Sequence, residues 1–198
     1  MAATRLTLES DREMASDRPR SEDELASILT AAYAYACSGN YGKAIDLCDW
    51  LIQDPGTEIA GLRQRSAVKT HMGDIDGAIA DLQALLEADR VEPADFHALG
   101  ILLLQNGSTT EAIERFDDAV KIGAAAKNPY YTKSSLLFGA EAKLKVGDFD
   151  GALRDVAQLP DGFRAYFSGT GMRTKEEIAC EATAAIERKA QSKFKFKK

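Results

Sequence analysis

The chain has 198 residues, of which 45% are hydrophobic and 28% charged, a balance that favours a globular or solenoidal fold. No run of about 18 apolar residues occurs, and eight charged residues fall within the first twenty, where a signal peptide needs an apolar segment. These features argue against a membrane-spanning protein and against secretion through a signal peptide. The net charge of −6 conceals a basic end, because six of the 25 Lys and Arg residues lie after residue 187.

The N-terminal residues 1–20 are polar, charged and aperiodic, so we expect a flexible leader. Ser21, with Glu24 three residues later, forms a capping-box pattern that predicts the start of the first helix. The three cysteines Cys37, Cys48 and Cys180 lie far apart without a C-x-x-C pair. Reduced thiols and a cytoplasmic location are therefore expected.

From residue 25 to about 160, glycines recur at a nearly fixed period. Gly39, Gly73 and Gly107 are 34 residues apart, and Gly147 follows after 40. Apolar positions recur in register with them. After each glycine they include Ala44, Ala78, Ala112 and Ala152, then Cys48, Leu82, Phe116 and Val156. Before each glycine a second helical stripe contains Ile28, Leu62, Phe96 and Leu136, with the small residues Ala32, Ser66, Gly100 and Ala140. The period predicts a helical repeat in which neighbouring units bury each other's apolar faces.

The glycine suits the left-handed end of a helix, and a capping residue follows it each time. The capping residues are Asn40, Asp74, Ser108 and Asp148. Each repeat is therefore predicted to be helix, tight turn, helix.

The small residue, the turn glycine and the alanine five residues later resemble the tetratricopeptide repeat. They recur in S-G-N-Y-G-K-A-I-D-L-C, M-G-D-I-D-G-A-I-A-D-L, N-G-S-T-T-E-A-I-E-R-F and V-G-D-F-D-G-A-L-R-D-V. Thr109 departs from the bulky residue that the family places after the turn, and the closing proline is displaced to Pro55 in the first unit. The resemblance implies an all-α, right-handed α-solenoid of about four repeats, at about 25–58, 59–92, 93–132 and 133–160.

Six extra residues separate the third and fourth glycines, where Asn128 precedes Pro129. We expect a lengthened second helix in the third repeat and then a break. Tyr130 and Tyr131 at this position are interpreted as aromatic packing between repeats, with partner contact as the alternative. Beyond the repeats, 161–173 is predicted as a loop, 174–191 as a capping helix opened by Thr174 and Glu177, and 192–198 as a basic tail.

The motifs of nucleotide-binding loops, zinc proteases and serine hydrolases are absent, so no catalytic residues, enzymatic activity, cofactor or small-molecule substrate are predicted. D-I-D-G at 74–77 and D-F-D-G at 148–151 suggest calcium loops but lack the remaining ligands. The resemblance places His71 and His97 on first-helix faces roughly 15 Å apart, too far to share a metal. We expect two partly exposed polar residues, with partner contact as the alternative, and no metal site.

The same geometry predicts a concave groove that binds a peptide or protein partner. Its residues are Tyr33, Arg63, Gln64, His71, His97, Ile101, Leu104, Gln105, Leu137, Phe138, Glu141 and Lys145. Tyr33, Ile101, Leu137 and Phe138 are predicted as exposed apolar anchors, and Arg63, Gln64, His97 and Glu141 as residues that fix register. Replacing Phe138 and Arg63 together is expected to abolish partner capture without unfolding the repeats. This interpretation requires a groove that the chain's own segments do not fill.

Some members of this family hold a chaperone's C-terminal carboxylate with a lysine and asparagine clamp, which is absent here. Leu29 and Tyr33 occupy the matching places in the first repeat, and Arg63 and Ala67 in the second. We therefore predict a noncatalytic protein-binding module that is a monomer or weak homodimer. A dedicated chaperone or immunity-type protein for one partner is one alternative. The ending K-F-K-F-K-K leaves nucleic-acid or membrane association as another, although the acidic body opposes both targets.

Overall fold

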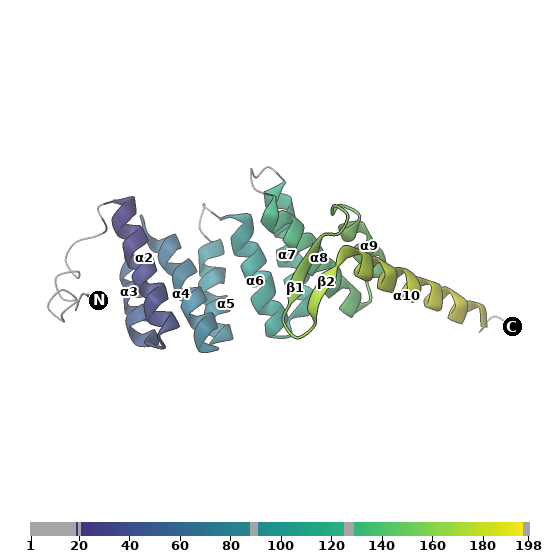
Figure 1. Cartoon of the computed structure of the whole chain (residues 1–198), viewed down its shortest axis with the longest axis horizontal. Coiled ribbons are helices and arrows are strands. Elements are labelled where there is room, and N and C mark those ends of the chain that lie inside the picture. Colours follow the sequence, from purple (N-terminus) through teal and green to yellow (C-terminus); the bar gives the residue numbers. More distant parts are fainter. Residues whose placement is uncertain (1–18, 20, 88–90, 125–128, 196–198) are drawn as a thin grey trace. The chain divides into compact units, whose positions relative to one another are not determined.

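The computed structural model describes residue 19 and residues 21–87, 91–124 and 129–195, with side chains up to residue 192 (Figure 1). Within these ranges nine helices and one two-stranded hairpin form. The chain divides into two compact units, residues 1–90 (unit 1) and 91–198 (unit 2). Helices dominate both units, which confirms the predicted all-α repeat fold.

Unit 1 consists of two helix pairs. Its helices are α2 (Glu22–Cys37), α3 (Tyr41–Ile52), α4 (Glu58–Met72) and α5 (Ile75–Leu86). Helix α2 begins directly after Ser21, whose Oγ accepts a hydrogen bond from the Glu24 backbone N–H at 3.2 Å. The predicted N-terminal cap is therefore present. Apart from residue 19, the expected flexible leader lies outside the described residues.

Unit 2 contains two further helix pairs, a hairpin and a final helix. Its elements are α6 (Pro93–Gln105), α7 (Thr109–Gly123), α8 (Tyr130–Val146), α9 (Phe149–Val156), β1 (Arg164–Phe167), β2 (Gly171–Thr174) and α10 (Lys175–Lys195). Helix α7 has 15 residues where α3 and α5 have 12, which is the lengthening expected from the six extra residues. Residues 125–128, with the expected break at Asn128, lie outside the described residues, and α8 begins three residues before the expected position 133.

The segment 161–173, predicted as a loop, contains most of an antiparallel hairpin, so that prediction is wrong. Arg164 pairs with Thr174 and Phe167 with Gly171, and the Thr170 N–H donates to the Phe167 carbonyl at 3.2 Å across the turn. Gly169 and Gly171 give no strand signal in the sequence, and two strands alone are marginally stable. The hairpin depends on packing against the helices, which a local pattern does not report.

The C-terminal helix begins where the sequence predicts. The Thr174 N–H donates to the Glu177 carboxylate at 2.9 Å, and the Glu177 N–H donates to Thr174 Oγ1 at 3.2 Å, a complete capping box. Helix α10 continues to Lys195, beyond the expected end at 191, and residues 196–198 of the basic tail lie outside the described residues. Ile178 and Ala182 of α10 are fully buried.

The turn glycines have the predicted left-handed conformation. Their φ angles are 76° at Gly39, 82° at Gly73, 84° at Gly107 and 81° at Gly147. The residues that follow them differ in what they do. Asp74 and Asp148 accept hydrogen bonds from the Gly77 and Gly151 N–H groups, at 3.0 and 2.9 Å, whereas Asn40 and Ser108 make no side-chain cap bond. The first aspartate of each calcium-like motif therefore serves as a helix cap.

The repeated apolar positions form the cores of both units. The alanine five residues after each glycine is fully buried in all four repeats. In the third repeat the small residue is Gly100, and a Cβ built there would lie 2.6 Å from the Phe116 ring. The missing side chain of Gly100 therefore makes room for the largest fully buried residue of the described chain, which occupies the register of Cys48, Leu82 and Val156.

Candidate partner-binding surface

The predicted groove residues fall into two groups, one on each unit. The unit 1 inner face consists of Tyr33 on α2 and Arg63, Gln64 and His71 on α4. The unit 2 inner face consists of His97, Ile101, Leu104 and Gln105 on α6 and Leu137, Phe138, Glu141 and Lys145 on α8.

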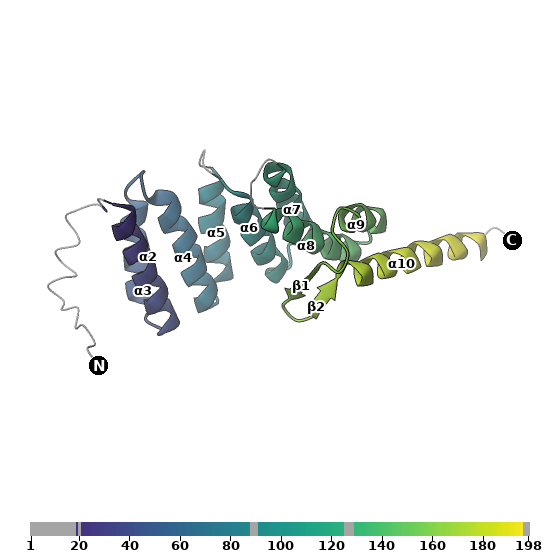
Figure 2. The same cartoon turned by 45° about the horizontal axis from the view of Figure 1, so that its top comes forward.

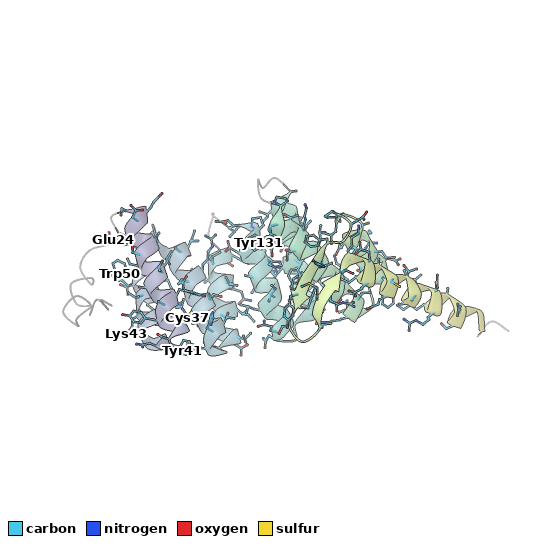
Figure 3. All side chains as sticks on the ribbon, viewed as in Figure 1. Glu24, Cys37, Tyr41, Lys43, Trp50 and Tyr131 are labelled. Carbon is cyan, nitrogen blue, oxygen red and sulfur yellow. The ribbon has the colours of Figure 1, made fainter. Side chains whose placement is uncertain are left out.

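The unit 1 inner face presents an aromatic pair to solvent. Tyr33 is 55% exposed, His71 is exposed, and their rings meet edge-on with centroids 6.3 Å apart. The Tyr41 hydroxyl donates to the His71 carbonyl at 3.3 Å, which ties the end of α4 to the start of α3. Cys37 and Tyr41 mark the turn between α2 and α3 (Figure 3). A hydrogen bond with Cys37 raises the pKa of Tyr33, so its hydroxyl stays protonated at neutral pH.

Arg65 and Lys69 of α4 form salt bridges within unit 1. Arg65 donates to the Asp81 carboxylate through Nε at 3.0 Å and Nη2 at 2.6 Å, and it also pairs with Asp49. Lys69 contacts the same Asp81 carboxylate at 2.8 Å. These four residues form the unit 1 charge cluster, which links α3, α4 and α5. Hydrogen bonding to Asp81 raises the pKa of Arg65, so the guanidinium stays charged within the fold.

His97 is buried, and the prediction of a partly exposed residue or partner contact at this position is wrong. The residue is 7% exposed, and its ring lies 2.9 Å from Ser135 Oγ through Nδ1 and 3.2 Å from Ser134 Oγ through Nε2. The ring also contacts Phe138 edge-on at 5.3 Å. Burial lowers the pKa of His97 to about 4, so the imidazole is neutral at neutral pH. The residue joins α6 to α8 as part of the core.

The predicted apolar anchors on α8 are also covered. Leu137 is fully buried and Phe138 is 9% exposed, so the prediction that they stand exposed is wrong. Phe167 of β1 stacks on Phe138 with ring centroids 4.0 Å apart and an interplanar angle of 27°. Both views place the hairpin beside α8 (Figures 1 and 2). The chain's own segment therefore occupies this part of the unit 2 inner face.

Glu141, predicted to fix the register of a partner, already holds an arginine of the hairpin. Arg173 of β2 donates to Glu141 Oε2 through Nη2 at 3.0 Å, and to Glu181 of α10 at 2.7 and 2.9 Å. Glu141 is 6% exposed. Hydrogen bonding to Glu181 raises the pKa of Arg173, and the nearby Glu141 charge adds to this effect. Arg173 fastens the hairpin to two helices.

The rest of the unit 2 inner face remains partly accessible. Ile101 and Leu104 are half-buried, and Gln105 and Lys145 are exposed. Tyr130 and Tyr131 at the start of α8 are also exposed, and Tyr131 is labelled in Figure 3. Tyr131 contacts the His97 ring at 5.7 Å. It therefore packs between successive helix pairs, as the first interpretation of this tyrosine pair expects.

No protein-family model and no curated protein matches the sequence. Solved structures match it in fold. The crystal structure of MamA aligns with a TM-score of 0.57 at 15% identity, covering 91% of this chain and 86% of MamA. YrrB, described as a TPR protein with an unusual peptide-binding site, aligns with a TM-score of 0.54 at 15% identity, covering 66% of this chain and 64% of YrrB. The chain has the tetratricopeptide repeat fold.

A third structure with this tetratricopeptide repeat fold is the Yersinia enterocolitica type III secretion chaperone SycD in complex with a peptide of the translocator YopD. It aligns with a TM-score of 0.53 at 23% identity, covering 65% of this chain and 99% of SycD. The resemblance found in the sequence is thus confirmed as a statement about fold. Within the described residues, no helix is both long and apolar enough to cross a membrane.

Unit 2 of this tetratricopeptide repeat fold also contains a charge cluster, which the comparison of single repeats does not predict. Lys143 of α8 lies 2.7 Å from Asp155 of α9 and 2.8 Å from Asp117 of α7. Burial alone would lower the pKa of Lys143, but its hydrogen bonds to Asp117 and Asp155 outweigh this and raise the pKa. We call these three residues the unit 2 charge cluster. Lys143 and Asp155 occupy the same positions relative to Gly147 as Lys69 and Asp81 do relative to Gly73. Aligning the second repeat with the fourth would therefore have indicated both clusters.

Proposed function

We propose that this chain is a noncatalytic module that binds a peptide or protein partner on the unit 1 inner face. The observation that carries the proposal is the solvent-facing contact between Tyr33 and His71 on two adjacent first helices. An exposed tyrosine beside hydrogen-bonding groups offers contact area at little cost in side-chain entropy. The arrangement sits on rigid helices, which limits the ordering required on binding.

Unit 1 is favoured over unit 2 because Tyr33 and His71 on its inner face are exposed, and Arg63 and Gln64 are half-buried. In unit 2, Phe138 and Glu141 are engaged by Phe167 and Arg173 of the same chain. The earlier expectation that Phe138 and Arg63 could be replaced without loss of folding does not hold for Phe138, which is a core residue. The accessible residues Gln105 and Lys145 of unit 2 remain candidates for secondary contacts.

The charge of unit 1 indicates the chemistry of the partner. Residues 21–87 carry eleven acidic and four basic residues, a net charge of −7 with histidine neutral. Two of the four basic residues, Arg65 and Lys69, are held in the unit 1 charge cluster. A basic segment would be attracted over a distance of about 10 Å at moderate salt. We therefore propose a cationic partner segment with an apolar or aromatic residue that packs on Tyr33.

The test is selection of peptides from a random library displayed on phage against the full chain, followed by affinity measurement on synthetic peptides. Trp50, the only tryptophan, lies on α3 and gives a fluorescence signal from unit 1 (Figure 3). We expect enriched basic peptides whose affinity falls at least tenfold, about 1.4 kcal/mol, with Tyr33→Ala and His71→Ala combined. Their affinity should also fall as salt rises from 50 to 500 mM.

The matched control is Tyr166→Ala, since Tyr166 is 68% exposed but lies on the hairpin of unit 2. This variant should bind the selected peptides as the wild type does. If the double variant in unit 1 kept full affinity, or if no peptide were enriched, the assignment to the unit 1 inner face would be wrong.

A role as the dedicated chaperone of one partner is a second candidate, which the fold similarity to SycD over nearly its whole length favours. It predicts a single protein that co-purifies in a fixed stoichiometry. An immunity-type role predicts that the co-purified protein is a toxin. Nucleic-acid or membrane association through the basic end predicts binding that is lost when residues 188–198 are deleted, which peptide binding on unit 1 should survive. We propose a cytoplasmic monomer or weak homodimer in each case.

A further inference from the structure

We infer that the β1–β2 hairpin is a built-in ligand of the unit 2 inner face, and that the vacated face binds an extended segment carrying an aromatic residue and an arginine. The occupant is residues 163–174 of this chain, whose Phe167 and Arg173 contact Phe138 and Glu141. This inference concerns other residues than the unit 1 proposal and is independent of it.

The aromatic half of the site is an apolar wall on α8. Phe138 stacks on Phe167 from one side and meets the His97 and Phe116 rings at 5.3 and 5.9 Å from the core. Only Phe167 comes from outside the helix pairs, and it is 5% exposed. A flat ring is the group that such a surface accepts, because offset stacking adds to the free energy of burial.

The charged half is a buried carboxylate that needs a cation. Glu141 is 6% exposed and accepts hydrogen bonds from Arg173 Nε and Nη2, at 3.2 and 3.0 Å. An occupant that covered this carboxylate without pairing it would pay the cost of burying an unpaired charge, so the face favours an occupant with a cationic group such as the Arg173 guanidinium. The second carboxylate, Glu181, is exposed on α10 and contacts the same arginine at 2.7 Å.

The hairpin has the properties of an exchangeable occupant. Its outer side is open, with Tyr166 and Met172 forming a cross-strand pair that is 68% and 55% exposed. Its base is tied independently, since Lys175 N–H donates to the Phe163 carbonyl at 3.0 Å and Gly162 N–H to Glu176 at 2.9 Å. This covalent tether keeps the hairpin at a high effective concentration beside the face. A competing segment must displace the hairpin, so its apparent affinity for the wild type is low.

The experiment adds the hairpin back in trans. In a full-length variant, residues 163–174 are replaced by a Gly-Ser linker of equal length, and the probe is a synthetic peptide with the sequence of residues 163–174. Fluorescence anisotropy should detect binding to the linker variant and at least tenfold weaker binding to the wild type. Peptides carrying Phe167→Ala or Arg173→Ala should bind the linker variant roughly tenfold less tightly or worse, while a Tyr166→Ala peptide should bind normally.

Absence of peptide binding to a linker variant that retains its helical circular dichroism would overturn the inference. If the linker variant does not fold, the full chain with Phe167→Ala and Arg173→Ala replaces it. Amide hydrogen exchange of residues 164–174 should then be at least tenfold faster than in the wild type, and the peptide should bind. Unchanged exchange or no binding in that variant would show that these two contacts do not hold the hairpin.

Discussion

The inner faces of units 1 and 2 differ because equivalent positions of α4 and α8 hold different residues. Ten and nine residues before the turn glycine, unit 1 has Arg63 and Gln64, whereas unit 2 has Leu137 and Phe138. Ala67 is exposed in unit 1, while Glu141 at the equivalent position is covered by Arg173. A polar inner face remains solvated, whereas an apolar one must be covered. The accessible surface of a helical repeat therefore depends on the segment that follows it.

The second repeats of the two units share features that the first repeats do not have. The second repeat of each unit has an aspartate cap with a glycine three residues later, and each has a Lys–Asp pair between its two helices. The first repeats have Lys43 and Glu111 where these glycines stand. The repeating element of the chain is therefore a two-repeat unit as well as a single helix pair.

The largest expected effect comes from breaking the charge clusters. Asp155→Ala leaves Lys143, whose side chain is 10% exposed, with Asp117 alone, and should lower the free energy of unfolding by about 4 kcal/mol. Asp81→Ala leaves Arg65 and Lys69, which are 23% and 20% exposed, and should cost less, about 3 kcal/mol. Urea denaturation followed by circular dichroism measures both.

The matched control replaces the whole pair. Lys143→Met with Asp155→Leu should recover most of the stability lost in Asp155→Ala, since neither charge of the buried Lys143–Asp155 pair remains. Equal stability of Asp155→Ala and the wild type would contradict the proposed importance of the unit 2 charge cluster.

A smaller effect is the pH dependence of stability that His97 causes. Because the pKa of His97 is lowered from 6.5 to about 4, the unfolded chain binds a proton more readily than the folded chain between these values. The stabilisation is complete above pH 6.5 and is lost as the pH falls toward 4, by about 2 kcal/mol between pH 7.5 and 5. The free energy of unfolding at the two pH values measures the loss.

Replacing the imidazole is the direct check on this prediction. His97→Gln should reduce the pH dependence by that amount. A His97→Gln variant with the full wild-type pH dependence would rule out His97 as its source.

The smallest expected effect tests the shared caps. An added Cβ at Gly77 or Gly151 would collide with the capping aspartate, so Gly77→Ala and Gly151→Ala should each lower the free energy of unfolding by about 1 kcal/mol. Gly42→Ala is the control, because no atom lies within 4 Å of its added Cβ, and it should raise stability by about 0.5 kcal/mol. Stabilisation by all three substitutions would contradict the role of the caps.

The candidate site could be predicted only in part from the sequence. The positions of Tyr33 and His71 on the first helices were enough to predict their exposure. The prediction holds because no described segment covers these two side chains. Burial of Phe138 and His97 did not follow, since Arg63, at the register of His97, and Gln64, at the register of Phe138, are only half-buried. An apolar pair on the inner face followed by the aromatic segment F-R-A-Y-F was the one signal that pointed to a cover.

The helix pairs, their turns and their cores could be predicted from the sequence, because a 34-residue period of small, apolar and capping residues acts through contacts close along the chain. Which inner face stays open depends on contacts between residues far apart in the sequence. Phe138 and Phe167 are 29 positions apart, and Glu141 and Arg173 are 32 apart. These contacts form only when the hairpin that follows α9 folds back onto α8. Burial of an aromatic ring and pairing of a buried carboxylate stabilise the hairpin in that position.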